Sequence, residues 1–114
     1  MHEASLAYSI LETVIRQCQA SNFARILEVR LRIGQDSGVQ PDSLKFAFDI
    51  CKKNTLAHDA EITFESVTLG GECKACGQDF AVENKAVFTC PHCGSGNFSI
   101  TRGFETEILD MEVE

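Results

Sequence analysis

Four cysteines in the second half of the chain have the spacing of a metal site. Cys73 and Cys76 form one C-x2-C pair, Cys90 and Cys93 form another, and a glycine follows each pair. Each pair places two sulfurs on one side of a tight turn, so two pairs can offer four thiolates to one zinc ion, about 2.3 Å from each sulfur. Glycine suits the left-handed backbone that such a turn needs. We therefore predict a structural Zn(II) site held by these four cysteines.

The same cysteines could instead form two redox-active pairs or a frame of disulfides. The start of the chain lacks the basic region and apolar core of a secretory signal, so we expect a cytoplasmic protein. A reducing compartment disfavours disulfides, which makes metal ligation the better use of the pairs. Cys18 and Cys51 fall on apolar helix faces and are expected to act as small buried hydrophobic residues.

A second set of candidate ligands lies at the start of the chain, which reads Met1-His2-Glu3. The Met1 amine, the His2 amide nitrogen and the His2 imidazole can form two fused chelate rings around one ion. Ni(II) and Cu(II) favour such a tetragonal nitrogen set. The alternative is a frayed terminus without a ligand role. His58 and His92 are expected to be solvated loop residues.

Composition and charge exclude several classes of function. The chain has 114 residues and a formal net charge of −7 at pH 7. Such a chain repels phosphate backbones, because nucleic-acid affinity comes largely from lysine and arginine. No apolar run approaches the roughly 20 residues that span a bilayer, and the sequence has neither a phosphate-binding loop nor a nucleophile with a placed base. We expect no nucleic-acid binding, no membrane span and no enzymatic activity.

The first half of the chain carries two helix patterns. Apolar residues recur four positions apart from Leu6 to Cys18, which predicts an amphipathic helix of about 14 residues with Ser5 as its N-cap. Pro41 predicts the start of a second helix, since its missing N–H costs nothing in a first turn. The predicted apolar face of that helix contains Leu44, Ala47, Phe48 and Cys51.

Alternating side chains predict the strands. Residues 25–33 alternate apolar and charged side chains, and residues 61–69 are rich in strand-forming residues. The alternation returns after Gly103. A C-terminal strand this apolar needs a sheet, so we expect it to return to the sheet of the first strands.

A change of composition at Gly70 and Gly71 marks a boundary. The segment 70–103 contains the cysteine pairs and few large apolar residues, so it must draw its stability from a metal. The predicted fold is therefore α+β. A small sheet with two helices forms a metal-binding domain of residues 1–69 plus 104–114, and residues 70–103 form an inserted zinc-ribbon domain.

These motifs together resemble the HypA/HybF family of nickel metallochaperones, which act in the maturation of nickel–iron hydrogenase. The resemblance covers essentially the whole chain. It is carried by the start Met1-His2-Glu3-x-Ser5-Leu6, by Val29-x-Leu31-x-Ile33-Gly34, by Pro41-Asp42-Ser43-Leu44-x-Phe46-Ala47-Phe48, by the two cysteine pairs, and by the end Met111-Glu112-Val113-Glu114.

The resemblance implies a role for the residues at the start of the chain. It makes His2 the principal ligand of a transient Ni(II) cargo, with Met1 and Glu3 contributing through backbone nitrogens or, for Glu3, its side chain. Asp42 matches an acidic position near that nickel site. The first domain is then the nickel-binding domain, and the four cysteines match the ligands of structural zinc.

The same resemblance implies the partners. They are a nickel-binding GTPase of the same pathway and the precursor of the hydrogenase large subunit, and some members also serve urease with its accessory proteins. The sequence leaves monomer and homodimer open. Two other functions compete with this interpretation. A rubredoxin-like electron carrier is disfavoured because the chain has no tryptophan, and a zinc-ribbon interaction module is disfavoured as a nucleic-acid binder by the negative charge.

Overall fold

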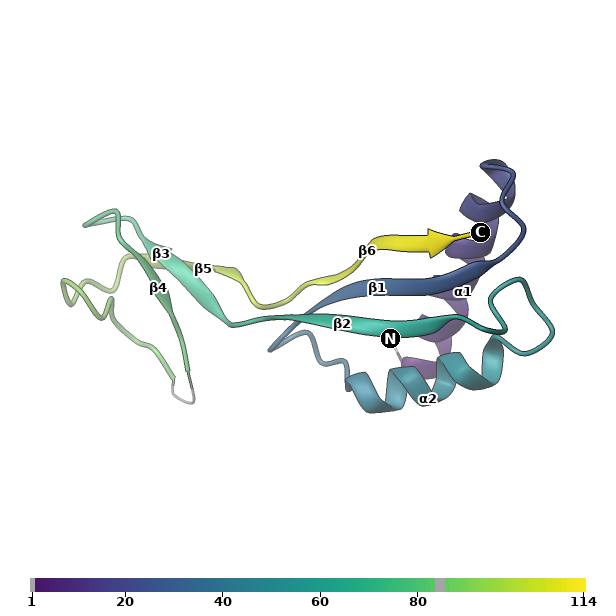
Figure 1. The fold of residues 1–114 in the computed structure, drawn as a ribbon. Helices are drawn as coiled ribbons and strands as arrows, with labels where there is room; N and C mark the ends of the chain where they lie inside the picture. Colours follow the sequence, from purple (N-terminus) through teal and green to yellow (C-terminus); the bar gives the residue numbers. More distant parts are fainter. Residues whose placement is uncertain (1, 84–85) are drawn as a thin grey trace. The chain divides into compact units, whose positions relative to one another are not determined.

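The computed structural model of this chain describes residues 2–83 and 86–114. Within them the helices and small sheets confirm the predicted α+β class (Figure 1). Neither helix in this part of the chain combines the length and apolarity that a membrane span needs. The elements are α1 (Glu3–Ala20), β1 (Ile26–Gly34), α2 (Pro41–Cys51), β2 (Glu61–Val67), β3 (Gly70–Cys73), β4 (Asp79–Ala81), β5 (Phe98–Arg102) and β6 (Thr106–Val113).

The chain divides into two compact units. The first contains the residues up to Arg32, Val39–Glu65 and Thr106–Glu114, and the second contains Ile33–Gly38 and Ser66–Glu105. The strand β1 therefore contributes to both units. Whether these units act as a nickel-binding domain and a zinc-ribbon domain, with the predicted boundaries, stays a prediction.

The helix α1 begins earlier than predicted. It has 18 residues, and its N-cap is His2 rather than Ser5. The first backbone hydrogen bond runs from the Leu6 N–H to the His2 carbonyl at 2.9 Å, so Ser5 already lies inside the helix. Because the acidic Glu3 in the first turn favours the positive end of the helix dipole, the helix extends beyond the apolar pattern. Its buried face contains Ala7, Ile10, Leu11, Val14 and Cys18.

The helix α2 begins at Pro41 as predicted. Leu44 and Phe48 are completely buried, whereas Ala47 and Cys51 are only half-buried. The two helices pack against one another, and α1 also contacts β6. The predicted apolar face of α2 is therefore divided between the core and a partly exposed flank.

The sheet of the first unit has the strand order β2-β1-β6, so the predicted return of the C-terminal strand is confirmed. Arg25 and Glu114 exchange backbone hydrogen bonds, and at the far end the Gly34 N–H donates to the Glu105 carbonyl at 2.8 Å. This register makes β1 and β6 antiparallel. The strand predicted over residues 61–69 ends at Val67.

The sheet of the second unit has the order β4-β3-β5, with antiparallel pairs on both sides of β3. Gly71 lies in the middle strand, where an added Cβ would collide with the Ser99 carbonyl. The rings of Phe80 and Phe98 meet edge to face, with centroids 5.7 Å apart. With Val82 also buried, this is a small apolar core for a unit that carries the four cysteines.

Candidate metal centre

The first cysteine pair lies in a tight turn that follows β3. The Cys73 N–H donates to the Gln78 carbonyl, and the Gly77 N–H donates to the Cys73 carbonyl, each at 2.9 Å. The Cys76 N–H points at the Cys73 Sγ from 3.4 Å. Gly77 has a φ of 76°, a conformation that side chains disfavour. The turn therefore gives each sulfur a backbone donor, the Cys76 N–H for Cys73 and the Gln78 N–H for Cys76.

The second pair repeats this closure. The Cys90 N–H donates to the Ser95 carbonyl at 2.7 Å, and the Gly94 N–H donates to the Cys90 carbonyl at 2.9 Å. The His92 N–H lies 3.3 Å from the Cys90 Sγ, and Gly94 has a φ of 80°. Two segments that share little besides cysteine and glycine thus adopt the same kind of turn.

The two turns bring all four sulfurs to one place. Their Sγ atoms lie within 4.8 Å of one another, and in the described residues this is the only group of three or more histidine, cysteine or acidic side chains placed to hold a metal ion. The Cys73–Cys93 sulfurs are 3.6 Å apart and the Cys76–Cys90 sulfurs 3.8 Å apart. A tetrahedron with metal–sulfur bonds of about 2.3 Å has edges of about 3.8 Å, so the four residues fit a tetrahedral ion.

The cage does not have the geometry of disulfides. A disulfide joins sulfurs at about 2.05 Å, and all six cysteines are free. Cys73 and Cys90 are buried, whereas Cys76 and Cys93 are exposed. One side of the cage therefore rests on the ribbon formed by β4, β3 and β5, and the other is open to solvent.

The backbone and the neighbouring thiols shift the pKa values of the four cysteines in opposite directions. The Cys76 N–H lowers the pKa of the Cys73 thiol to about 7. The pKa of Cys76 is raised to about 12, because burial and the three neighbouring cysteines outweigh the Gln78 N–H, which lowers it. Four thiolates cannot be charged together without a cation, and a bound divalent ion reverses this balance.

An ion pair beside the cage was not predicted from the sequence. Arg102 of β5 donates two hydrogen bonds to the Asp79 carboxylate, at 2.8 and 3.0 Å, and a third to the Phe80 carbonyl at 3.0 Å. The Arg102 partner lowers the pKa of Asp79. Gly70 leaves room for this guanidinium, which an added Cβ would meet. The spacing of these residues in the sequence does not predict the ion pair. They come together only because β4 and β5 pair with the two edges of β3.

The predicted solvated histidines are exposed, and each has neighbours. The His92 Nε2 lies 3.2 Å from the Asp79 backbone oxygen. The His58 Nδ1 lies 2.9 Å from the Thr55 carbonyl, and its Nε2 lies 3.1 Å from Asp59. Neither imidazole joins the group of four sulfurs.

Among the described residues predicted to bind nickel, His2, Glu3 and Asp42 form no group of three candidate ligands. His2 is exposed, Glu3 is half-buried in the first turn of α1, and Asp42 is exposed in the first turn of α2. The described part of the chain holds no group of three ligands that includes them. The predicted role of Met1 lies outside the described residues. The His2 imidazole makes no hydrogen bond that caps the helix.

The fold and the site define a class: a small α+β metal-binding protein with a four-thiolate cage in a ribbon. A family profile described as "Hydrogenase/urease nickel incorporation, metallochaperone, hypA" matches residues 1–113. The chain therefore belongs to the HypA family of nickel metallochaperones, and the resemblance noted from its motifs is confirmed.

Relatives and solved structures agree with this assignment. A hydrogenase maturation factor HypA from Chlorobium phaeobacteroides is 40% identical over 114 residues, covering 100% of both chains. The factor of the same name from Geobacter metallireducens is 38% identical over 116 residues with the same coverage. The solution structure of the Ni metallochaperone HypA from Helicobacter pylori matches with a TM-score of 0.70 and 26% identity, over 99% of this chain and 97% of that chain.

Proposed function

We propose that this protein binds Ni(II) at its N-terminus and delivers it during the maturation of nickel–iron hydrogenase, while its four cysteines hold a structural Zn(II) ion. The observation that carries the nickel part is the start of α1 at Glu3, with His2 as its N-cap. That start leaves the nitrogen donors at the beginning of the chain outside the helical hydrogen-bond ladder.

The first turn of α1 explains how those nitrogens can serve as ligands. The first N–H that bonds within the helix belongs to Leu6, so the amides of His2 and Glu3 have no intrahelical acceptor. They can lose their protons to a metal without breaking a helical bond. The positive end of the helix dipole opposes a bare cation, but deprotonated amides and the Glu3 carboxylate offset that charge.

The donor set suits nickel and its release. Together with the Met1 amine, the His2 amide and imidazole form a nitrogen-rich tetragonal set, which Ni(II) favours over Zn(II). The fourth position falls to the Glu3 amide or carboxylate, and the family resemblance adds Asp42 as an acidic group of the site. His2 is exposed, so a partner can reach the ion. A delivery protein needs such an open site.

The cysteine cage suits a resident ion instead. Soft thiolates in a closed tetrahedral set hold zinc tightly, and the small apolar core of the ribbon depends on such a crosslink. When bound, zinc supplies the charge that lets all four thiols remain ionised. The described turns supply the cage with backbone N–H donors, which orient the sulfurs.

The proposed partners follow from this role. They are a nickel-binding GTPase that exchanges nickel with this chain and the hydrogenase large-subunit precursor that receives it. Urease accessory proteins are a second route, since the family description names both enzymes. The protein itself carries the ion and catalyses no reaction.

Nickel titration of untagged protein by calorimetry tests the proposal. We expect one nickel ion per chain, bound in nitrogen-rich coordination by X-ray absorption, and loss of that binding in His2→Ala or after an N-terminal extension. His58→Ala is the matched control, because His58 is also an exposed histidine of the first unit, and it should bind nickel normally. Unchanged nickel binding in His2→Ala would reject the proposed site.

A further inference from the structure

The C-terminal strand β6 lies at one edge of the first sheet. In the order β2-β1-β6 it has a strand partner on one side only (Figure 1). The N–H and C=O groups of its other side are therefore not used in this ladder. Such an edge can pair with a further strand, and β6 has 8 residues, a common length for a paired strand.

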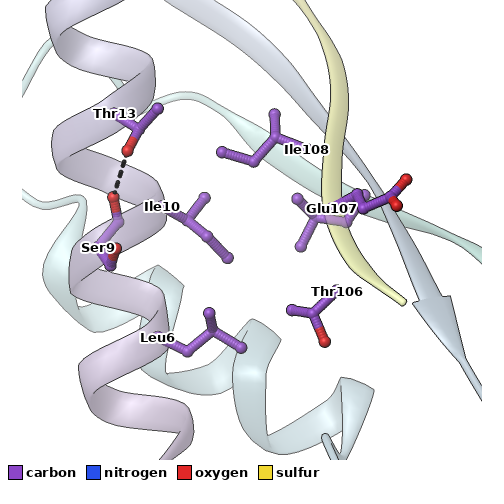
Figure 2. Close-up of a pocket in the computed structure, with 8 residues that line it drawn as sticks. Leu6, Ser9, Ile10, Thr13, Thr106, Glu107 and Ile108 are labelled. Carbon is purple, nitrogen blue, oxygen red and sulfur yellow. Dashed lines mark hydrogen bonds between the residues drawn. The ribbon is translucent and has the colours of Figure 1, made fainter. Parts of the chain in front are cut away.

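Two apolar hollows lie between this edge and α1. One, of about 240 Å³, is bordered by Leu6, Ile10 and Ile108, and Figure 2 shows all three side chains directed toward its interior. The second, of about 320 Å³, is bordered by Val14, Ile108 and Met111. Ile108 borders both hollows and is 37% exposed. Apolar side chains from outside would cover surface that the chain itself leaves open.

The charged side chains of the edge strand itself are all acidic. Residues 106–114 contain no lysine or arginine. Within the described part of the chain, Glu112 is exposed and has no ion-pair partner, whereas its acidic neighbours face arginines. The α1 residues that border the hollows are uncharged. The acidic residues of this stretch are Glu107, Asp110, Glu112 and Glu114.

We propose that the β6 edge and the two hollows bind an extended segment of a partner protein in which apolar and basic side chains alternate. Main-chain hydrogen bonds along β6 give the affinity. The apolar side chains enter the hollow beside Met111, and a basic side chain pairs with the neighbouring Glu112. Because side chains of a strand alternate between its two faces, an alternating segment can satisfy both requirements at once.

A second copy of this chain fits the same edge poorly. Antiparallel pairing of β6 with its own copy about Asp110 would place two carboxylates opposite each other, and like charges at that position are destabilising. A basic partner segment meets no such repulsion. The hollow of Figure 2 also begins at Leu6, whose N–H bonds the His2 carbonyl at 2.9 Å. A segment that fills this hollow therefore reaches a point one helical turn from His2.

A synthetic peptide tests the proposal without knowledge of the natural partner. The probe is a blocked peptide about as long as β6 in which valine and lysine alternate. Amide hydrogen exchange of the zinc-loaded protein should slow in residues 106–113 when the peptide is added. A peptide of equal charge with prolines in place of the valines should give no such protection, since proline cannot pair with a strand.

Two pairs of variants separate edge binding from general charge attraction. Glu112→Lys should weaken peptide binding about fivefold, as expected for reversing one exposed ion pair, whereas Glu72→Lys should leave the affinity unchanged. Glu72 is also exposed on a strand, but in the second unit. Ile108→Asp should likewise weaken binding, while Phe46→Asp on the exposed side of α2 should not. Exchange rates of α1 amides confirm that the first-unit variants are folded, and those of β3 amides confirm it for Glu72→Lys.

Several results would overturn the proposal. They are equal weakening by both lysine variants, equal binding of the proline peptide, or absence of protection in residues 106–113. Sedimentation that shows a dimer, with protection of these residues rising with protein concentration, would assign the edge to a second copy instead. None of these readouts depends on nickel, so failure here leaves the proposed nickel site untouched.

Discussion

Removal of the metal should unfold the second unit and leave the first one intact. The apolar core of the second unit is small: Ile33, Phe80 and Val82 are its buried side chains other than cysteine in the described residues. Burial of these three contributes about 5–9 kcal/mol together, whereas binding of structural zinc contributes about 10–16 kcal/mol in comparable small domains. The metal term is the larger one, so the ribbon sheet should not persist without it.

Amide hydrogen exchange measures this prediction residue by residue. After chelation, the Cys73 and Cys90 amides should lose protection, because the turns that bond them to the Gln78 and Ser95 carbonyls open. The amides of α1 and α2 should keep theirs, since the first unit has its own core around Phe48. Ribbon amides that stay protected in metal-free protein would refute the reasoning.

A substitution of one ligand gives the same test without a chelator. Cys90→Ser should lower zinc content and reproduce the selective loss of protection. Cys51→Ser is the matched control, because Cys51 is a half-buried cysteine of the first unit, and its loss should leave zinc content unchanged. Equal zinc content in the two variants would contradict the assignment of the cage.

Two further predictions concern packing and charge. Gly71→Ala should weaken zinc binding and lower the thermal stability of the ribbon, because the new Cβ collides with the Ser99 carbonyl, while Gly96→Ala should be neutral, since nothing lies within 4 Å of its Cβ position. The hydrogen bond from Arg30 lowers the pKa of Asp110, so this pair stabilises the fold above the ordinary aspartate pKa of about 3.9 and loses its effect as the pH falls through the lower, folded-state pKa. Carboxyl NMR titration should show that pKa rising in Arg30→Met; an unchanged value would exclude the pairing.

The sequence by itself determined the features that depend on local spacing. The C-x2-C pairs and the glycines after them predicted two tight turns, and those turns follow from bonds between residues at most five positions apart. The periodic apolar residues predicted both helices, and the alternating segments predicted β1, β2 and β6. The combination of these motifs with the Met1-His2-Glu3 start was enough to indicate the family, because both sets of candidate ligands are short motifs in the chain.

Local pattern was less reliable at the ends of elements. The apolar stripe of α1 begins at Leu6, but the helix begins at Glu3, because hydrogen bonding and the dipole continue a helix beyond its buried face. The strand β2 is two residues shorter than the predicted segment 61–69, because it ends at Val67. Periodicity measures burial, and an element can be longer or shorter than its buried stretch.

Only the tertiary structure decided which distant residues meet. It placed sulfurs from two turns within 4.8 Å of one another, joined Arg102 to Asp79 across β3, and left β6 at the edge of its sheet beside two open hollows. These relations depend on strand order and register, which are set by contacts between segments many residues apart. No spacing within one segment carries that information.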